Sequence, residues 1–385
     1  MPRPKIVTIY GTRPEAIKVA PIITALSGDG RFESVAVSTG QHLEMLEQVN
    51  RMFGIRPKWD LHLMEPGQSL NRLVSRAIEG LDEVIDAETP DIIVVQGDTS
   101  TAMAAALAGF HRGVKIVHLE AGLRTGDIHS PFPEEANRKL IGQVTELHLA
   151  PTAGSMENLR RENVRSKDIA VTGNTVIDAL LEAASWDTEF EDPALQEAAE
   201  SGKRLVVVTT HRRENLEAMK EIGGAVKDLA ESYSDINFVL PLHLNPKVRE
   251  AVLPEVESLP NVVITNPLPY DQFTKLLDRA TIILTDSGGV QEEAPALGKP
   301  VLVMRQNTER PEAVVAGTVK LVGTNRSLIV AEAKLLLDDD AAYHSMANAV
   351  NPYGDGKAAE RAVAAIAELL GVGERLPDFD PSVES

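Results

Sequence analysis

The amino-acid sequence predicts an α/β protein whose parallel, doubly wound sheets are divided between two domains. Short runs of β-branched residues alternate with segments of helical periodicity, the order typical of βαβ units. Apolar residues within those runs are mostly continuous rather than alternating, as expected for strands covered on both faces. The chain has 385 residues, more than one hydrophobic core usually serves, so two domains are expected.

Two series of strands are predicted, each with helices between its members. The first series comprises residues 5–10, 34–38, 91–96, 114–119 and 146–150. The second series comprises residues 204–210, 237–241, 262–265, 281–285 and 300–304. Helical spacing of apolar residues marks the segments 15–26, 70–88, 216–231 and 273–279.

The domain boundary is expected where strand character is lost. The stretch 186–201 is acidic and separates the two series of strands. We therefore expect an N-terminal domain over residues 1–170 and a C-terminal domain over 171–355. A helix is predicted at about 356–370, and residues 371–385, which contain proline and acidic side chains, are predicted to form a frayed tail.

The composition excludes several classes of protein. Lys and Arg number 38 against 57 Asp and Glu, and the net charge of −19 disfavours nucleic acid or an anionic membrane as a partner. The absence of cysteine excludes disulfides, thiolate metal sites and cysteine nucleophiles, and the nine histidines form no H-E-x-x-H pattern. Neither a signal peptide nor an apolar stretch near the roughly 20 residues of a membrane helix is evident, so a cytoplasmic protein is expected.

Polar residues follow five of the predicted strands, where an open parallel sheet binds its ligands. They are Arg13, Asp98, Glu120, His211 and the turn Ser287-Gly288-Gly289. The turn opens a predicted helix, and the first backbone N–H groups of a helix can hold a phosphate. Because the chain has neither a G-x-G-x-x-G fingerprint nor a P-loop lysine, nicotinamide and ATP-loop sites are disfavoured.

The carboxylates among these candidates also have structural interpretations. Asp98 could cap the helix that begins near Thr99, and Glu120 could pair with Arg124. Glu134 and Arg138 are four residues apart and could form a surface ion pair. Asp98, Glu120 and Glu134 gathered in one site would instead push their pKa values apart, which suits acid/base catalysis.

Eight motifs together resemble the non-hydrolysing UDP-N-acetylglucosamine 2-epimerases, in order, from about residue 5 to about residue 370. Each motif is long, and their joint occurrence is highly specific. The motifs are GTRPEAIK at 11–18, QGDT at 96–99, HLEAGLRT at 118–125, PEEANR at 133–138, TGNTVID at 172–178, HRRE at 211–214, TDSGGVQEEAP at 285–295 and NPYGDG at 351–356.

The resemblance implies a fold and a reaction. The fold is GT-B, in which two Rossmann-like domains face a cleft and the C-terminal helix crosses back to the first domain. The reaction is the interconversion of UDP-GlcNAc and UDP-ManNAc by anti elimination of UDP to 2-acetamidoglucal and its re-addition. It uses no cofactor, neither nicotinamide nor metal. Family members are typically homodimers that serve cell-surface polysaccharide biosynthesis.

The resemblance also implies roles for individual residues. Asp98, Glu120 and Glu134 are the acid/base candidates, with His211 as a further catalytic residue that contacts the diphosphate. A second UDP-GlcNAc, bound as an activator, would contact Gln41, Glu44, Gln68 and His243. The residues expected to bind the substrate are Arg13, Lys18, Arg212, Ser287, Gly288, Gly289, Glu293 (through the ribose hydroxyls) and Phe273.

Three other functions remain open at this point. A hydrolysing epimerase would share the elimination step and release UDP and free ManNAc. A GT-B glycosyltransferase would share the nucleotide-binding half but would not require the three acids of the first half. A nucleotide-sugar-binding scaffold would bind UDP without turnover.

Overall fold

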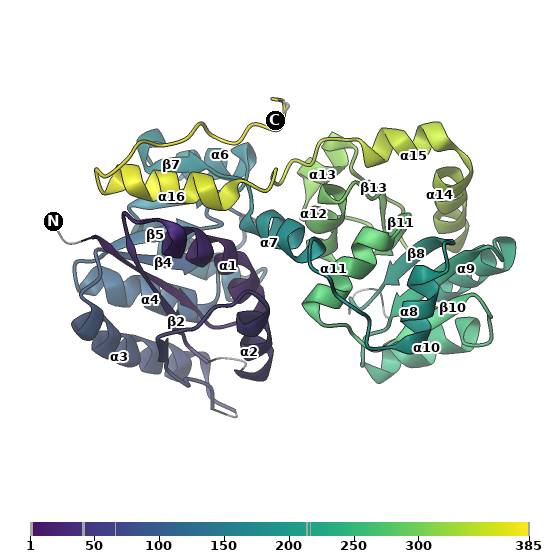
Figure 1. Ribbon diagram of the computed structural model, residues 1–385, viewed down its shortest axis with the longest axis horizontal. Helices are drawn as coiled ribbons and strands as arrows, with labels where there is room; N and C mark the ends of the chain where they lie inside the picture. The colour runs from purple at the N-terminus through teal and green to yellow at the C-terminus, as the bar shows by residue number, and fades with distance from the viewer. Residues whose placement is uncertain (1–2, 41–42, 66, 213–214, 216, 384–385) are drawn as a thin grey trace. The chain divides into compact units, whose positions relative to one another are not determined.

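The computed structural model describes residues 3–40, 43–65, 67–212, 215 and 217–383, and it divides into two compact units (Figure 1). Unit 1 comprises Met1–Ala179 and Tyr353–Ser385, and unit 2 comprises Leu180–Pro352. The chain leaves unit 1 later than the predicted domain end at residue 170, because the single helix α7 (Thr175–Ala184) runs through this region.

In the described residues, unit 1 is built on a seven-stranded parallel sheet with the order β3-β2-β1-β4-β5-β6-β7. The order reverses between β1 and β4, which is the topological switch point of a doubly wound sheet. The strands are β1 (Lys5–Tyr10), β2 (Glu33–Ser38), β3 (Trp59–Asp60), β4 (Ile92–Gln96), β5 (Lys115–Leu119), β6 (Leu147–Ala150) and β7 (Ile169–Val171).

Helices cover this sheet because its strands are apolar on both faces. On one face, Ile93, Val95 and Ile116 form a buried core with the small side chains of α4 and with Leu81 of α3. Helix α16, yellow in Figure 1, belongs to unit 1 and packs against α1. Besides α7, the helices are α1 (Arg13–Gly28), α2 (Leu43–Met52), α3 (Leu70–Glu88), α4 (Ser100–His111), α5 (Glu134–Gln143), α6 (Ala153–Arg161), the 3-10 helix η1 (Ser166–Asp168) and α16 (Ala358–Leu369).

Unit 2 repeats the same architecture on a six-stranded parallel sheet with the order β10-β9-β8-β11-β12-β13 among its described residues. Its switch point lies between β8 and β11. The strands are β8 (Arg204–Thr209), β9 (Ile236–Pro241), β10 (Val262–Thr265), β11 (Ile282–Thr285), β12 (Val301–Val303) and β13 (Val319–Leu321). The helices are α8 (Pro193–Glu200), α9 (Met219–Ser232), α10 (Pro246–Val256), α11 (Tyr270–Arg279), α12 (Gly288–Ala296), α13 (Pro311–Ala316), α14 (Arg326–Asp338) and α15 (Asp340–Ala347).

The fold class predicted from the sequence is confirmed: two parallel sheets alternate with helices in a Rossmann-like manner. Each of the ten predicted strands is present to within a residue or two. Strands β3, β7 and β13 were not predicted, because two or three residues are too few to show a pattern.

The C-terminal segment is anchored along the edge strand β7, so the prediction of a frayed tail is wrong for this part. The Phe379 N–H donates to the Val171 carbonyl oxygen at 2.7 Å, and the Val171 N–H donates to Asp378 Oδ1 at 3.0 Å. Arg375 donates to the Ile169 carbonyl oxygen at 2.7 Å, and the Phe379 ring is buried under the Arg361 guanidinium. The segment covers backbone groups that an edge strand would otherwise expose.

No helix within the described ranges is both long enough and apolar enough to cross a membrane.

Candidate functional site

The turn after β1 is fixed by a buried carboxylate. Glu15, in the first turn of α1, accepts hydrogen bonds from the Gly11 and Thr12 N–H groups at 2.8 and 2.7 Å. It also accepts one from Thr99 Oγ1 at 2.5 Å, which ties the ends of β1 and β4 together. Position 11 requires glycine, because a Cβ there would lie 1.9 Å from Thr39 Oγ1. Arg13, a predicted diphosphate ligand, is the first residue of α1 and so lies at this switch point.

Glu120 lies directly after β5 and is surrounded by donors. Its backbone adopts φ +62°, a left-handed conformation that few non-glycine residues adopt. Lys18 Nζ donates to both carboxylate oxygens at 2.5 and 2.7 Å. Asn174 Nδ2 donates to Oε1 at 3.3 Å, and the Gln96 side-chain amide donates to Oε2. These donors replace the water that a buried carboxylate loses, and they stabilise its negative charge.

The predicted alternative of a Glu120–Arg124 pair is therefore wrong. Lys18 is the cation that pairs with Glu120. Arg124 instead forms a two-pronged ion pair with Glu162, with N···O distances of 2.9 and 2.7 Å.

Asp98 lies at the neighbouring strand end, after β4. There the effects that favour its protonated form outweigh those that favour its charged form. Burial, together with the nearby charge of Glu120, raises the pKa of Asp98, although Arg138 and Lys18 act in the opposite direction. Asp98 does not cap α4: the N-cap is Thr99, whose Oγ1 accepts a hydrogen bond from the Ala102 N–H at 3.0 Å. The carboxyl group of Asp98 is therefore not used as a helix cap.

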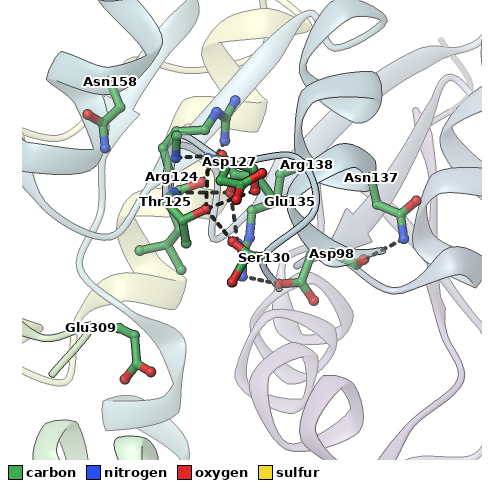
Figure 2. A network of polar contacts seen from close by, with 12 residues as sticks. Asp98, Arg124, Thr125, Asp127, Ser130, Glu135, Asn137, Arg138, Asn158 and Glu309 are labelled. Atoms are coloured by element: carbon green, nitrogen blue, oxygen red, sulfur yellow. Dashed lines mark hydrogen bonds and ion pairs between the residues drawn. The ribbon is translucent and has the colours of Figure 1, made fainter. Parts of the chain in front are cut away.

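Helix α5 holds Asp98 from the side, as Figure 2 shows. Arg138 Nη2 donates to Asp98 Oδ2 at 2.5 Å, and Asn137 Nδ2 donates to the Asp98 carbonyl oxygen at 2.9 Å. Arg138 also pairs with Glu135 at 3.1 Å, so the predicted Glu134–Arg138 ion pair is not formed. Glu134 begins α5, is partly exposed, and makes no side-chain hydrogen bond or ion pair with the residues that the structure describes.

In unit 2 the switch-point loop is built around Asp286, which directly follows β11 and is fully buried. Its carboxylate accepts hydrogen bonds from the N–H groups of His211 and Arg212 at 3.0 Å each. The side chains of Thr210 and Asn215 donate to it at 2.9 and 3.2 Å. Burial alone would raise the pKa of Asp286, but hydrogen bonding to His211 and Arg212 outweighs burial and lowers the pKa.

The same carboxylate orients the His211 ring. Nδ1 of His211 lies 3.2 Å from Asp286 Oδ1, while the ring itself is exposed. Because Nδ1 of His211 contacts Asp286, Nε2 is the ring nitrogen that can contact a ligand. The ring of His243 stacks on that of His211 with centroids 6.0 Å apart, so a residue predicted for the activator site contacts one predicted for catalysis.

The turn Ser287-Gly288-Gly289 forms the N-terminus of α12, as predicted. The Ser287 N–H donates to Thr285 Oγ1 at 2.9 Å, which fixes the entry to the helix. A Cβ on Gly288 would lie 3.4 Å from Arg212 Nη2, so the Arg212 guanidinium lies beside this helix start. A guanidinium next to free helical N–H groups is an arrangement suited to a phosphate.

The remaining predicted residues take the following positions. Glu293 lies one turn into α12, and Phe273 lies half-buried on α11. Gln68 of unit 1 donates to Met64 Sδ at 3.0 Å. Gln41 and the side chain of Glu44 lie outside the described residues. Within the described ranges, no cluster of three or more His, Cys, Asp or Glu side chains could hold a metal ion.

Sequence reasoning missed four residues that hold the predicted ones in place. Asp286 and Gln96 stand at strand ends and could have been nominated from that position alone. Asn174 follows the unpredicted strand β7, so it gave no such signal. Glu135 was indistinguishable from Glu134 by sequence, because only the three-dimensional structure shows which of the two faces inward.

The described chain thus has two Rossmann-like units, each with polar side chains at the switch point of its sheet. A family model described as UDP-N-acetylglucosamine 2-epimerase matches residues 24–367. The UDP-N-acetylglucosamine 2-epimerase of Escherichia coli O157:H7 is 49% identical over 368 residues, covering 94% of this chain and 98% of the relative. The chain therefore belongs to the UDP-N-acetylglucosamine 2-epimerase family.

Solved structures of the family share the fold. The UDP-GlcNAc 2-epimerase of Neisseria meningitidis, bound to UDP-GlcNAc, is 43% identical with a TM-score of 0.82 and covers 94% of this chain and 100% of its own. The enzyme of Methanocaldococcus jannaschii, in complex with UDP-GlcNAc and UDP, is 32% identical with a TM-score of 0.74, covering 96% and 100% of the two chains.

Proposed function

We propose that this protein is a non-hydrolysing epimerase that interconverts UDP-GlcNAc and UDP-ManNAc at C2 of the sugar. The observation that carries the proposal is the pair of carboxylates at adjacent strand ends. Glu120 has its charge satisfied by Lys18 and two amides, whereas burial raises the pKa of Asp98. Two carboxyl groups with different protonation behaviour in one site suit a reaction that removes a proton and returns one.

The chemistry requires an elimination, because the C2 proton is not next to a carbonyl group. A base takes this proton, the C2–H electron pair forms the C1=C2 bond, and the C1–O bond breaks to release UDP with its electron pair. In the return step an acid protonates C2 on the opposite face, and a UDP oxygen re-forms the bond to C1. UDP and water are neither consumed nor released overall.

In unit 1, we assign the proton transfers to Asp98, Glu120 and Glu134. Asp98 is the group suited to alternate between protonated and ionised forms. Glu134 has no protein partner among the described residues and is available to the sugar. Glu120 keeps Lys18 in place, and Lys18 with Arg13 supplies positive charge.

In unit 2, we assign binding of the nucleotide. The α12 N-terminus at Ser287, Gly288 and Gly289, with Arg212, would take the diphosphate. His211, oriented by Asp286, would place Nε2 against the departing phosphate oxygen. Glu293 would accept the ribose hydroxyls, and Phe273 would contribute apolar contact to the nucleotide.

Three further expectations accompany the proposal. A second UDP-GlcNAc would activate the enzyme through Gln41, Glu44, Gln68 and His243, and the His243–His211 stack offers a contact between that ligand and catalysis. The protein would act in the cytoplasm as a homodimer, which size-exclusion chromatography with light scattering tests. Its product would serve cell-surface polysaccharide biosynthesis.

The decisive experiment follows the purified protein with UDP-GlcNAc in deuterated water by NMR. We expect UDP-ManNAc to accumulate with deuterium at C2, because the proton that returns comes from the solvent-exchanged acid. Free ManNAc with stoichiometric UDP would instead establish a hydrolysing enzyme. Unlabelled UDP-ManNAc would exclude elimination and re-addition.

Substitution of the three acids tests their assignment. Asp98→Asn, Glu120→Gln and Glu134→Gln are each expected to lower kcat by about 10² or more, because each removes a proton-transfer group while preserving shape. Glu162→Gln, which neutralises a carboxylate paired with Arg124, is the matched control and should retain activity. Near wild-type turnover in all three acid variants would contradict the assignment.

A further inference from the structure

Glu135 is a buried carboxylate for which the proposed reaction has no direct use. It follows Glu134 at the start of α5, and its side chain is fully buried. Oε1 accepts a hydrogen bond from the Gly126 N–H at 3.2 Å. Oε2 accepts one from the Thr125 N–H at 3.2 Å and one from Arg138 Nη1 at 3.1 Å (Figure 2). A buried carboxylate needs such partners, and the cation among them also contacts Asp98.

Arg138 is shared between two carboxylates. Nη1 reaches Glu135 at 3.1 Å and Nη2 reaches Asp98 at 2.5 Å, while only 14% of the Arg138 side chain is exposed. A guanidinium is planar and cannot turn one nitrogen without turning the other. The ion pair between Arg138 and Asp98 therefore depends on the ion pair between Arg138 and Glu135.

The backbone of Asp98 is held separately, through the hydrogen bond from Asn137 Nδ2 to its carbonyl oxygen at 2.9 Å. A change at Glu135 thus reaches the Asp98 side chain through Arg138 and leaves the backbone anchor in place. Among the residues that the structure describes, the charged groups that act on the Asp98 carboxyl are Arg138 from α5, Lys18 from α1 and Glu120 after β5.

We propose that Glu135 is a positioning residue, which by sharing the Arg138 guanidinium with Asp98 limits how firmly that guanidinium holds the Asp98 carboxylate. Without the Glu135 carboxylate, Arg138 would pair with the Asp98 carboxylate alone. Asp98 would then remain ionised and would return a proton less readily. The consequence for turnover rests on the proposed function, whereas the electrostatic coupling does not.

The test measures the titration of the Asp98 carboxyl carbon by ¹³C NMR in protein labelled at aspartate, with Asp98→Asn providing the assignment. In Glu135→Gln, which keeps the shape and an acceptor oxygen, we expect the Asp98 midpoint to fall by about one pH unit. The limb of the kcat/KM profile that Asp98→Asn abolishes should move to lower pH. At neutral pH, kcat should fall about tenfold with little change in KM.

Two further variants separate charge from shape. Glu135→Asp keeps the charge but shortens the side chain, and its Asp98 midpoint should stay near that of the wild type. Glu162→Gln removes the carboxylate of the neighbouring Arg124 pair and should leave the midpoint unchanged. A midpoint that stays or rises in Glu135→Gln, or falls equally in Glu162→Gln, would overturn the proposal.

A double variant tests whether the coupling passes through Arg138. The double variant Arg138→Gln with Glu135→Gln leaves no unpaired buried charge from this pair. Its Asp98 midpoint should match that of Arg138→Gln alone, because the effect of Glu135 passes through Arg138. A full shift in the absence of Arg138 would overturn the proposal. Because this readout needs no substrate, it stands apart from the test of epimerase activity.

Discussion

His118 shows how a single buried side chain fixes the position of a proposed catalytic group. Its Nε2 lies 2.7 Å from the carbonyl oxygen of Gly97, the residue before Asp98, so Nε2 carries the proton and donates it. Gly97 has φ +70° and donates its own N–H to the Leu119 carbonyl oxygen at 3.0 Å. Burial lowers the pKa of His118 to about 3, so the ring is uncharged at neutral pH. The turn that carries Asp98 thus rests on a neutral hydrogen bond from the next strand.

Replacement of His118 should therefore slow catalysis without weakening binding. His118→Phe removes the donor, and we expect kcat to fall by about 10- to 100-fold with little change in KM, because Asp98 is displaced. His118→Gln can still donate and should recover much of the loss. Steady-state kinetics with UDP-GlcNAc measures both constants.

The neighbouring strand supplies the control. His148 pairs in register with His118, is equally buried, and has a pKa that burial lowers to about 4. His148→Phe should lower the melting temperature but leave kcat close to that of the wild type. Equal losses of kcat in the two phenylalanine variants would contradict the positioning role of His118.

At the scale of elements, both switch-point turns are organised by a buried carboxylate. In unit 1, Glu15 of α1 accepts the N–H groups of the turn after β1, and in unit 2, Asp286 after β11 accepts those of the turn after β8. Each charge-assisted hydrogen bond of this kind contributes about 1.5–3 kcal/mol. These hydrogen bonds hold the backbone of each turn in place, which suits the proposed stabilisation of a transient charge.

A half-buried carboxylate, that of Asp178, is expected to make the stability of unit 1 depend on pH. Asp178 of α7 accepts hydrogen bonds from the Ala358 and Ala359 N–H groups at the start of α16. Burial, with a contribution from Asp355, raises the pKa of Asp178 to about 6. The folded state keeps this proton as pH rises from about 4 to 6, whereas the unfolded state has lost it, so the contribution to stability falls across that window.

Asp178→Asn should remove this dependence. We expect the free energy of unfolding of the variant, relative to the wild type, to rise by roughly 1–3 kcal/mol between pH 4 and pH 7. Urea unfolding at a series of pH values measures the difference. Asp29→Asn is the control, because the Arg31 guanidinium lowers the pKa of Asp29. The free energy of unfolding of this variant, relative to the wild type, should stay constant above pH 5. A constant difference for Asp178→Asn as well would contradict the burial argument.

At the scale of the whole molecule, the fold could be predicted because its signals are local. A strand such as Val262–Thr265 is a continuous apolar run, and a helix such as Leu70–Glu88 has apolar side chains at helical spacing. The positions of Asp98, Glu120 and His211 could be predicted for a related reason, since each lies within two residues of the end of such a run. Topology then brings the strand ends of one sheet to a single edge.

The partners of these residues could not be predicted in the same way. Lys18 and Glu120 are 102 residues apart, and Asp98 and Arg138 are 40 apart. By sequence spacing alone, Glu134 was the better partner for Arg138 and Arg124 the better partner for Glu120. The structure selects other partners because helix orientation and burial, rather than separation along the chain, decide which charges meet.

The return of the chain to unit 1 has a consequence for biosynthesis. Unit 2 is continuous in sequence, whereas unit 1 needs Tyr353–Ser385 to complete it. Translation proceeds at about 5–20 residues per second, so the middle of the protein emerges whole while the first sheet still lacks α16 and the cover of β7. Unit 2 can thus finish folding first, whereas unit 1 must wait until residues 353–385 have emerged from the ribosome. The exposed β7 edge during that interval is where we expect chaperones to bind nascent chains.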